Sequence, residues 1–133
     1  MNKKLFYPAI FHKAEEGGFW VSYPDLPECF TEGDDMAQAY EMAIDALGLA
    51  LTSREKEGEL IPDPSHPDTI SVDADSFLAV IEINLLAYKK RISPKAVKKT
   101  LSIPEWLNDE AMAAKLNFSQ ILQEALMAKL QLH

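Results

Sequence analysis

The last 39 residues of the chain, 95–133, limit its possible folds more than any other segment. One face of residues 97–103 carries Val97, Lys99, Leu101 and Ile103, and the other carries Lys98, Thr100 and Ser102, which predicts one short strand. Helices are predicted over 105–116 and 119–130. Segments shorter than about 40 residues usually need a metal, disulfides or oligomerisation to fold. The segment contains no cysteine, and its one histidine is the final residue, so we expect it to fold through oligomerisation.

A lone strand leaves its backbone donors and acceptors unpaired, and a second chain can pair them. We therefore predict a two-fold homodimer in which two copies of the strand form an antiparallel ribbon and four helices bury its inner face. The sequence leaves open whether such dimers pair further into tetramers. The side chains expected at the dimer interface are Val97, Leu101, Ile103, Trp106, Ile121, Leu122 and Leu126.

The outer face of this ribbon would present lysine and hydroxyl side chains. A two-stranded ribbon fits the major groove of B-DNA, where such side chains contact base edges. The N-terminus of the second helix can offer backbone N–H groups to a phosphate. We expect DNA contacts from Lys98, Lys99, Thr100 and Ser102 on the strand, from Asn117, Phe118 and Ser119, and from the basic residues Lys89, Lys90 and Arg91.

Four of the residues assigned to DNA contacts or to the dimer interface have simpler interpretations. Ser119 is a suitable helix N-cap, which by itself accounts for a serine at that position. Trp106 suits a core or dimer interface better than base stacking. Lys98 and Lys99 are also the residues that keep a strand edge from aggregating.

Charge is distributed unevenly along the chain, whose net charge is −8. Residues 1–87 contain 17 Asp and Glu against 5 Lys and Arg, whereas residues 88–133 contain 8 Lys and Arg against 4 Asp and Glu. This asymmetry indicates an acidic body with a basic tail module. The alternative is a chance fluctuation on a solvated surface.

The acidic body has the pattern of a small α+β domain. Strands are predicted over residues 4–12, 19–23, 29–31 and 77–84, with a hairpin joining the first two. Between the last two strands, apolar residues at helical spacing predict one long helix ending at Lys56. We expect a small antiparallel sheet covered by this helix.

Three local features refine this expectation. Pro8 cannot donate to a strand ladder, so the first strand is expected to have an edge or bulge there. Residues 24–27 contain two prolines and are predicted to form a rigid loop. Asp34 is a suitable N-cap for the long helix, and Asp35 complements its dipole.

The segment 88–94 is basic and contains a proline, and it is predicted to be a linker between domains 1–87 and 95–133. Cys29 is the single cysteine, which excludes an internal disulfide and argues against a cysteine zinc site. No apolar run approaches the roughly 20 residues of a membrane span. We expect a cytoplasmic protein with no membrane contact and no cofactor.

The tail resembles a ribbon-helix-helix DNA-binding domain. Residues 99–108 read KTLSIPEWLN and residues 117–120 read NFSQ, and the resemblance covers about residues 95–132.

The body is similar to the HicB antitoxins. The segments that carry this similarity are residues 7–9 (YPA), 18–22 (GFWVS), 24–29 (PDLPEC) and 33–34 (GD). One departure is Glu28, where the family usually has glycine before the cysteine.

The resemblance implies that the body has a partial RNase H-like fold and neutralises a small HicA toxin, an mRNA-cleaving ribonuclease with a double-stranded-RNA-binding-like fold and a catalytic histidine. It also implies that the tail binds palindromic operator DNA as a dimer and represses the operon. An acidic body suits this role, because a ribonuclease presents a positive surface to RNA. Toxin contacts are expected at Asp25, Glu28 and Glu32.

Two other functions are open at this point. The chain could be a dimeric protein-interaction module that does not bind DNA. An RNase H-like fold also suggests a metal-dependent nuclease, which needs converging carboxylates. The candidates are Asp25, Asp34, Asp73 and Glu82, and no spacing brings them together. We therefore expect no catalytic residues and no metal site.

Overall fold

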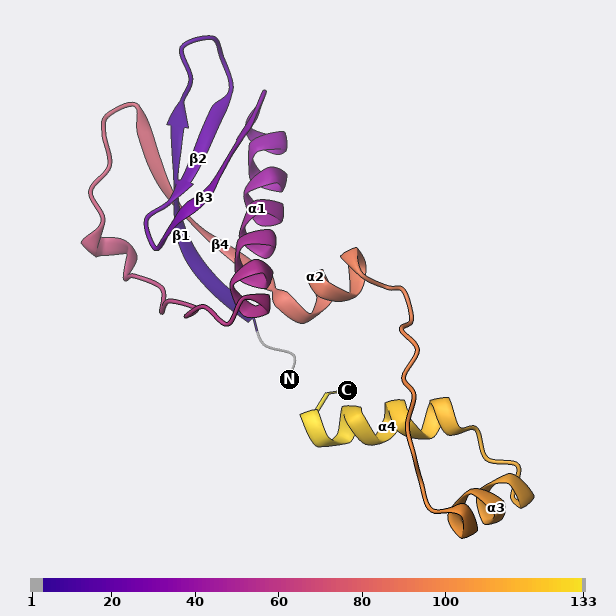
Figure 1. The fold of residues 1–133 in the computed structure, drawn as a ribbon. Helices are drawn as coiled ribbons and strands as arrows, with labels where there is room; N and C mark the ends of the chain where they lie inside the picture. The colour runs from indigo at the N-terminus through magenta and orange to yellow at the C-terminus, as the bar shows by residue number, and fades with distance from the viewer. Residues whose placement is uncertain (1–3, 133) are drawn as a thin grey trace. The chain divides into compact units, whose positions relative to one another are not determined.

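The computed structural model describes residues 4–132, which form two compact units. The first unit ends at Ile92 and the second begins at Ser93 (Figure 1).

The first unit contains a four-stranded antiparallel sheet. Its order is β3-β2-β1-β4, so β1 is central and β3 and β4 are the edges. The α+β class expected from the sequence is confirmed. The strands are β1 (Lys4–Lys13), β2 (Phe19–Tyr23), β3 (Leu26–Gly33) and β4 (Ser76–Asn84).

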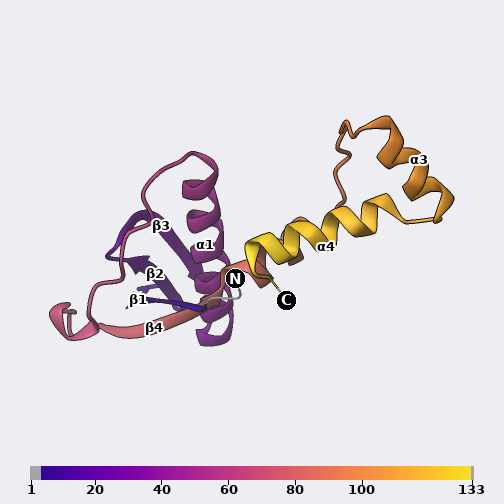
Figure 2. The same cartoon turned by 90° about the horizontal axis from the view of Figure 1, so that it is seen from below.

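Helix α1 (Met36–Lys56) lies along one face of this sheet (Figures 1 and 2). Alternate side chains of β1 point to it, and Tyr7, Ala9 and Phe11 are buried. The Tyr23 hydroxyl donates a hydrogen bond of 2.6 Å to the carbonyl of Ala43 on α1. The core therefore lies between α1 and one face of the sheet, and within residues 4–92 no helix covers the opposite face.

Pro8 lies where β1 has a partner on one side only. Strand β2 pairs with β1 from Ile10 to Lys13, whereas Pro8 is paired with Val80 of β4. The local edge expected at this proline is present, and its missing N–H group breaks no ladder with β2.

Two sequence-based boundaries are wrong. The N-cap of α1 is Asp35 rather than Asp34, because the Asp35 carboxylate accepts from the Gln38 N–H, three residues on, at 2.8 Å. Strand β3 begins at Leu26, so the loop predicted over 24–27 is shorter. Because β3 is an edge strand, it can accommodate Pro27.

The predicted linker also differs from the structure, because residues 85–92 form helix α2 (Leu85–Ile92). Leu85 and Tyr88 are buried in the core of the first unit. Gly48 of α1 permits this contact, since a Cβ atom there would lie 2.6 Å from the Tyr88 ring. The boundary between the units therefore lies after Ile92, five residues beyond the one predicted.

The second unit contains helices α3 (Glu105–Ala113) and α4 (Phe118–Leu130). Helix α3 ends before the predicted Leu116, and Lys115 adopts a positive φ of 57°. Within the described residues, 93–104 form no strand. A strand over 97–103 would need a partner strand to complete a ladder, so the ribbon stays a prediction.

A one-turn 3₁₀ helix, η1 (Pro67–Thr69), interrupts the long segment between α1 and β4. None of the helices in residues 4–132 combines the length and the apolar character that a membrane span requires.

Candidate protein-binding and DNA-binding surfaces

Asp25, the first of three acidic residues predicted to bind a partner, is used inside the first unit. Its carboxylate accepts from the backbone N–H of Ser65 at 2.9 Å and from the Ser65 hydroxyl. It therefore holds the segment that follows α1 against the turn between β2 and β3.

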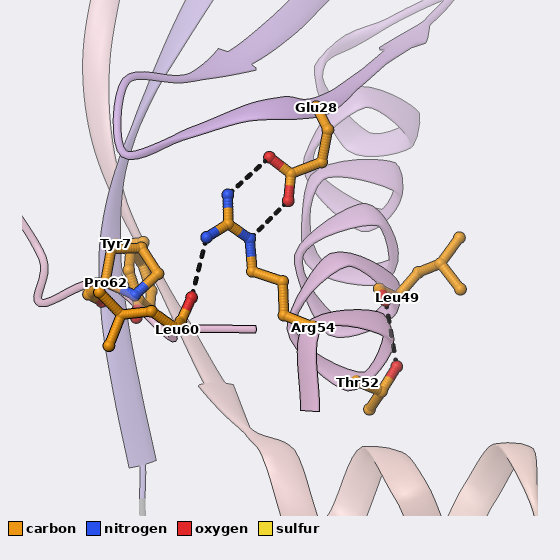
Figure 3. Close-up of polar contacts among 7 residues, drawn as sticks. All are labelled: Tyr7, Glu28, Leu49, Thr52, Arg54, Leu60 and Pro62. Atoms are coloured by element: carbon orange, nitrogen blue, oxygen red, sulfur yellow. Dashed lines mark hydrogen bonds and ion pairs between the residues drawn. The ribbon is translucent and has the colours of Figure 1, made fainter. Parts of the chain in front are cut away.

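Glu28 is also engaged within the unit (Figure 3). Its two carboxylate oxygens accept from Nε and Nη2 of Arg54 at 2.6 and 2.9 Å. Nη1 of Arg54 donates to the Leu60 carbonyl at 2.9 Å. The guanidinium holds the pKa of Glu28 below its usual value. This ion pair joins the edge strand β3 to the end of α1.

A groove of about 510 Å³ lies between β3 and α1. Cys29 lies at this groove, and burial raises the pKa of its thiol to about 12. The thiol is therefore protonated at neutral pH, as expected for a small buried apolar residue rather than a nucleophile. The lining residues are Glu28, Cys29, Phe30, Ala46, Leu49, Ala50, Ser53, Arg54, Glu57 and Glu59.

Glu32 is exposed near the end of β3 and pairs in register with Trp20 of β2. Among the described residues it has no ion pair. Of the three predicted acidic residues, Glu32 is the one whose carboxylate is not used within the fold.

The open face of the sheet carries an aromatic pair that the sequence analysis missed. The Trp20 and His12 rings stack with centroids 3.6 Å apart and an interplanar angle of 9°. Nε2 of His12 lies 2.9 Å from the Ser22 hydroxyl, and Nδ1 lies 3.1 Å from the Ser76 hydroxyl. Burial lowers the pKa of His12, which favours the neutral form of the ring. The signal for this pair was the hairpin register, which places His12 opposite Trp20.

Large apolar side chains accompany this pair on the open face. In each strand they alternate with the buried residues that contact α1, and they remain exposed to solvent. Besides Trp20 itself, they are Phe6, Phe30 and Val80. An exposed apolar patch of this kind is typical of a protein interaction site.

The residues predicted to bind DNA fall into three groups. Lys98, Lys99, Thr100 and Ser102 are exposed on the extended segment before α3. Asn117, not Ser119, caps α4, with its side chain accepting from the Gln120 N–H at 3.0 Å. Phe118 and Ser119 are exposed in the first turn of α4.

The third group lies on α2, in the first unit. Lys89 forms an ion pair with Glu55 of α1, and the Arg91 guanidinium lies 5.4 Å from the Tyr88 ring centroid. Lys90 is exposed. Two of these three basic side chains therefore already have partners within the fold.

The seven residues predicted at a dimer interface are not buried in the single chain. Leu122 is half-buried, and Val97, Leu101, Ile103, Trp106, Ile121 and Leu126 are exposed. Neither α3 nor α4 has a buried residue. Apolar exposure along both helices is the pattern expected of a surface that a partner covers.

The four carboxylates considered for a nuclease site do not form one group. Asp25 and Asp34 lie at opposite ends of β3, Asp73 lies in the segment before β4, and Glu82 pairs with Lys4 at 3.2 Å. Within residues 4–132, no group of three or more His, Cys, Asp or Glu side chains is arranged to hold a metal ion.

Comparison with known proteins shows that residues 7–126 match the model of a family described as the HicB-like antitoxin of bacterial toxin-antitoxin systems. Antitoxin HicB of Escherichia coli K12 is 31% identical over 95% of this chain and 96% of its own length. Antitoxin HicB 1 of Photorhabdus laumondii is 45% identical over 65% of this chain. This chain spans about half, 56%, of the length of that second relative.

A solved structure described as a toxin-antitoxin complex from Streptococcus pneumoniae contains a similar chain. The two chains superpose with a TM-score of 0.60 at 26% sequence identity. The superposition covers 96% of this chain and 99% of that one.

Proposed function

The chain belongs to the HicB-like antitoxin family of bacterial toxin-antitoxin systems, and on that premise we propose that it binds and neutralises a HicA-type toxin. The observation that carries this proposal is the family match, which extends over 7–126 and so includes residues of both units. An antitoxin acts by binding its toxin, so this function needs no catalytic residues. The toxin-binding part is the first unit.

Charge supports this assignment. A toxin that cleaves mRNA must bind a polyanion and therefore presents a positive surface, while residues 1–87 contain 17 acidic against 5 basic side chains. Opposite charges speed the encounter of two proteins and exclude wrong partners. The antitoxin acts by covering the toxin's RNA-binding surface in the cytoplasm.

The second unit is proposed to be a ribbon-helix-helix dimer that represses the operon. Its apolar helices need a partner, and two copies of residues 97–103 would complete the missing ladder. Lys98, Thr100 and Ser102 would then face the major groove of a palindromic operator. Dimers of this kind can associate into higher oligomers.

The toxin-binding proposal is tested with the purified chain and the product of the adjacent small reading frame. We expect a complex that survives gel filtration and stops cleavage of a reporter mRNA. High salt should slow association, because screening weakens charge steering. Absence of both complex and inhibition would contradict the proposal, whereas inhibition with salt-independent association would remove only the steering.

The repressor proposal is tested by fluorescence anisotropy of the full-length chain on its own upstream DNA and on a scrambled duplex. We expect selective binding that falls steeply as salt rises. Equal binding to both duplexes, or none, would contradict repression and leave a dimeric protein-interaction module.

A further inference from the structure

One row of side chains crosses all four strands on the open face of the sheet. The register pairs Ser76 with His12, His12 with Trp20, and Trp20 with Glu32. Directly opposed residues of antiparallel strands point to the same side, so these four lie together on the face away from α1. We call this row the Trp20 surface.

The indole of Trp20 is held in place before any partner arrives. Its stack on His12 is supported by two serine hydroxyls, one on each nitrogen of the imidazole. Trp20 is nevertheless 45% exposed. Because His12 covers one face of the indole, the opposite face is the one available for contact. An ordered aromatic ring loses little conformational entropy on binding.

Acidic residues surround this end of the sheet. The hairpin turn and the segments that flank β3 and β4 lie at this same end, since Phe19 pairs with both Lys13 and Gly33, and Lys13 N–H donates to the Asp75 carbonyl at 3.1 Å. Lys13 is a basic residue at this end. The acidic residues on these segments are Glu15, Glu16, Glu32, Asp34, Asp35, Asp73 and Asp75.

We propose that the Trp20 surface is the docking site of the toxin and that it receives an arginine from the toxin's basic RNA-binding surface. The guanidinium stacks on the free face of Trp20 and pairs with the carboxylate of Glu32. A planar guanidinium suits both contacts, because it stacks on aromatic rings and binds carboxylates in a bidentate manner. This inference rests on the proposed antitoxin function.

Charge distinguishes this occupant from the other candidates. A second copy would bring two strongly acidic surfaces together, which like-charge repulsion disfavours. The groove between β3 and α1 offers Glu28, but Arg54 already neutralises that carboxylate. The Trp20 surface combines an available carboxylate with an available aromatic face.

The test measures affinity for the toxin, taken as the product of the adjacent small reading frame, by isothermal titration calorimetry. Trp20→Ala and Glu32→Gln should each weaken binding by at least about tenfold, as residues at the centre of an interface do. Matched controls lie on α1, on the other side of the sheet. Tyr40 is also 45% exposed, and Glu41 is an exposed acidic residue. Tyr40→Ala and Glu41→Gln should stay within about twofold of the wild-type affinity.

A second readout does not depend on substituting Trp20. In a Trp106→Phe background, Trp20 is the one tryptophan of the chain. Iodide quenching of its fluorescence should fall when the toxin is added. Unchanged quenching in a formed complex would overturn the inference, as would quenching that falls with antitoxin concentration alone, because a second copy would then cover the surface.

The outcomes separate the two proposals. If the wild-type chain does not bind the toxin, the proposed function is wrong and the inference falls with it. If the wild-type chain binds the toxin, and the folded Trp20→Ala and Glu32→Gln variants bind it with the wild-type affinity, only the inference is wrong. Circular dichroism establishes that each variant is folded, and equal losses in the α1 controls would contradict a docking site on the open face.

Discussion

The two units differ in how they bury apolar side chains. In the first, Tyr7, Phe11, Leu47 and Ile81 are among a continuous set buried between the sheet and α1. In the second, neither α3 nor α4 has a buried residue, although both carry apolar side chains at helical spacing. The first unit therefore has a core of its own, whereas the apolar side chains of α3 and α4 stay exposed in the single chain. We propose that a second copy covers them and completes a shared core.

The largest expected effect comes from placing a charge in this proposed core. Leu101→Asp should abolish both dimer formation and operator binding, because an unpaired carboxylate would be buried on the inner face of the two-stranded ribbon. Sedimentation equilibrium measures the loss of the dimer, and fluorescence anisotropy measures the loss of operator binding. The control is Met112→Asp, since Met112 is 64% exposed and Leu101 is 62% exposed, but only Leu101 is predicted at the interface. A dimeric Leu101→Asp variant would show that the interface is elsewhere.

The first unit should respond to a core substitution without any effect on the second. Leu47 is fully buried on α1, and Leu47→Ala should lower the free energy of unfolding of this unit by about 2 to 5 kcal/mol. Urea titration followed by Trp20 fluorescence measures the loss. Leu49→Ala, on the exposed side of the same helix, should change it by about 0.5 kcal/mol or less. Equal losses in both variants would contradict the assigned core.

DNA recognition should depend on the second unit in a sequence-specific way. Thr100→Ala or Ser102→Ala should each cost about 1 to 3 kcal/mol of operator binding and relax specificity at the contacted base. Ser93→Ala, at the exposed start of the same segment, is the control. Operator affinity that is unchanged in both Thr100→Ala and Ser102→Ala would mean that the ribbon does not read the DNA.

The smallest expected effect concerns the ion pair at the edge of the first unit. Arg54 lowers the pKa of Glu28, so the stabilisation is fully present above pH 4.5, the usual value for Glu, and is lost as pH falls through the lower folded pKa. Glu28→Gln should therefore destabilise the unit at pH 7 by at most about fivefold in its folding equilibrium, because the pair is partly exposed. In urea titrations at successively lower pH, the difference in stability between the wild-type chain and Glu28→Gln should vanish. A difference that persists at low pH would assign the effect to packing.

Period-two and helical patterns made most of the first unit predictable. Tyr7, Ala9 and Phe11 alternate with residues of the opposite face, and β2 has the predicted bounds. Two adjacent aspartates made the N-cap ambiguous, and the hydrogen bond to Gln38 selects Asp35. Local sequence cannot settle such a choice when both residues are good caps.

Features that depend on tertiary contacts were the ones missed. The basic residues and Pro94 suggested a linker, but burial of Leu85 and Tyr88 against α1 makes residues 85–92 a helix. The availability of the three acidic residues also depended on the fold, because Asp25 and Glu28 find partners distant in sequence. The Trp20–His12 stack required the hairpin register as well as the strand pattern.

We propose that the first unit folds within one chain and that the second folds only with a second copy. The chain has one tryptophan in each unit, Trp20 and Trp106, so Trp106→Phe and Trp20→Phe variants report on the units separately. Urea unfolding is measured for both over a range of protein concentrations. A tenfold rise in concentration should stabilise the transition reported by Trp106 by about 1.4 kcal/mol and leave that of Trp20 unchanged. A concentration-independent transition at Trp106 would show that the second unit folds without a second copy.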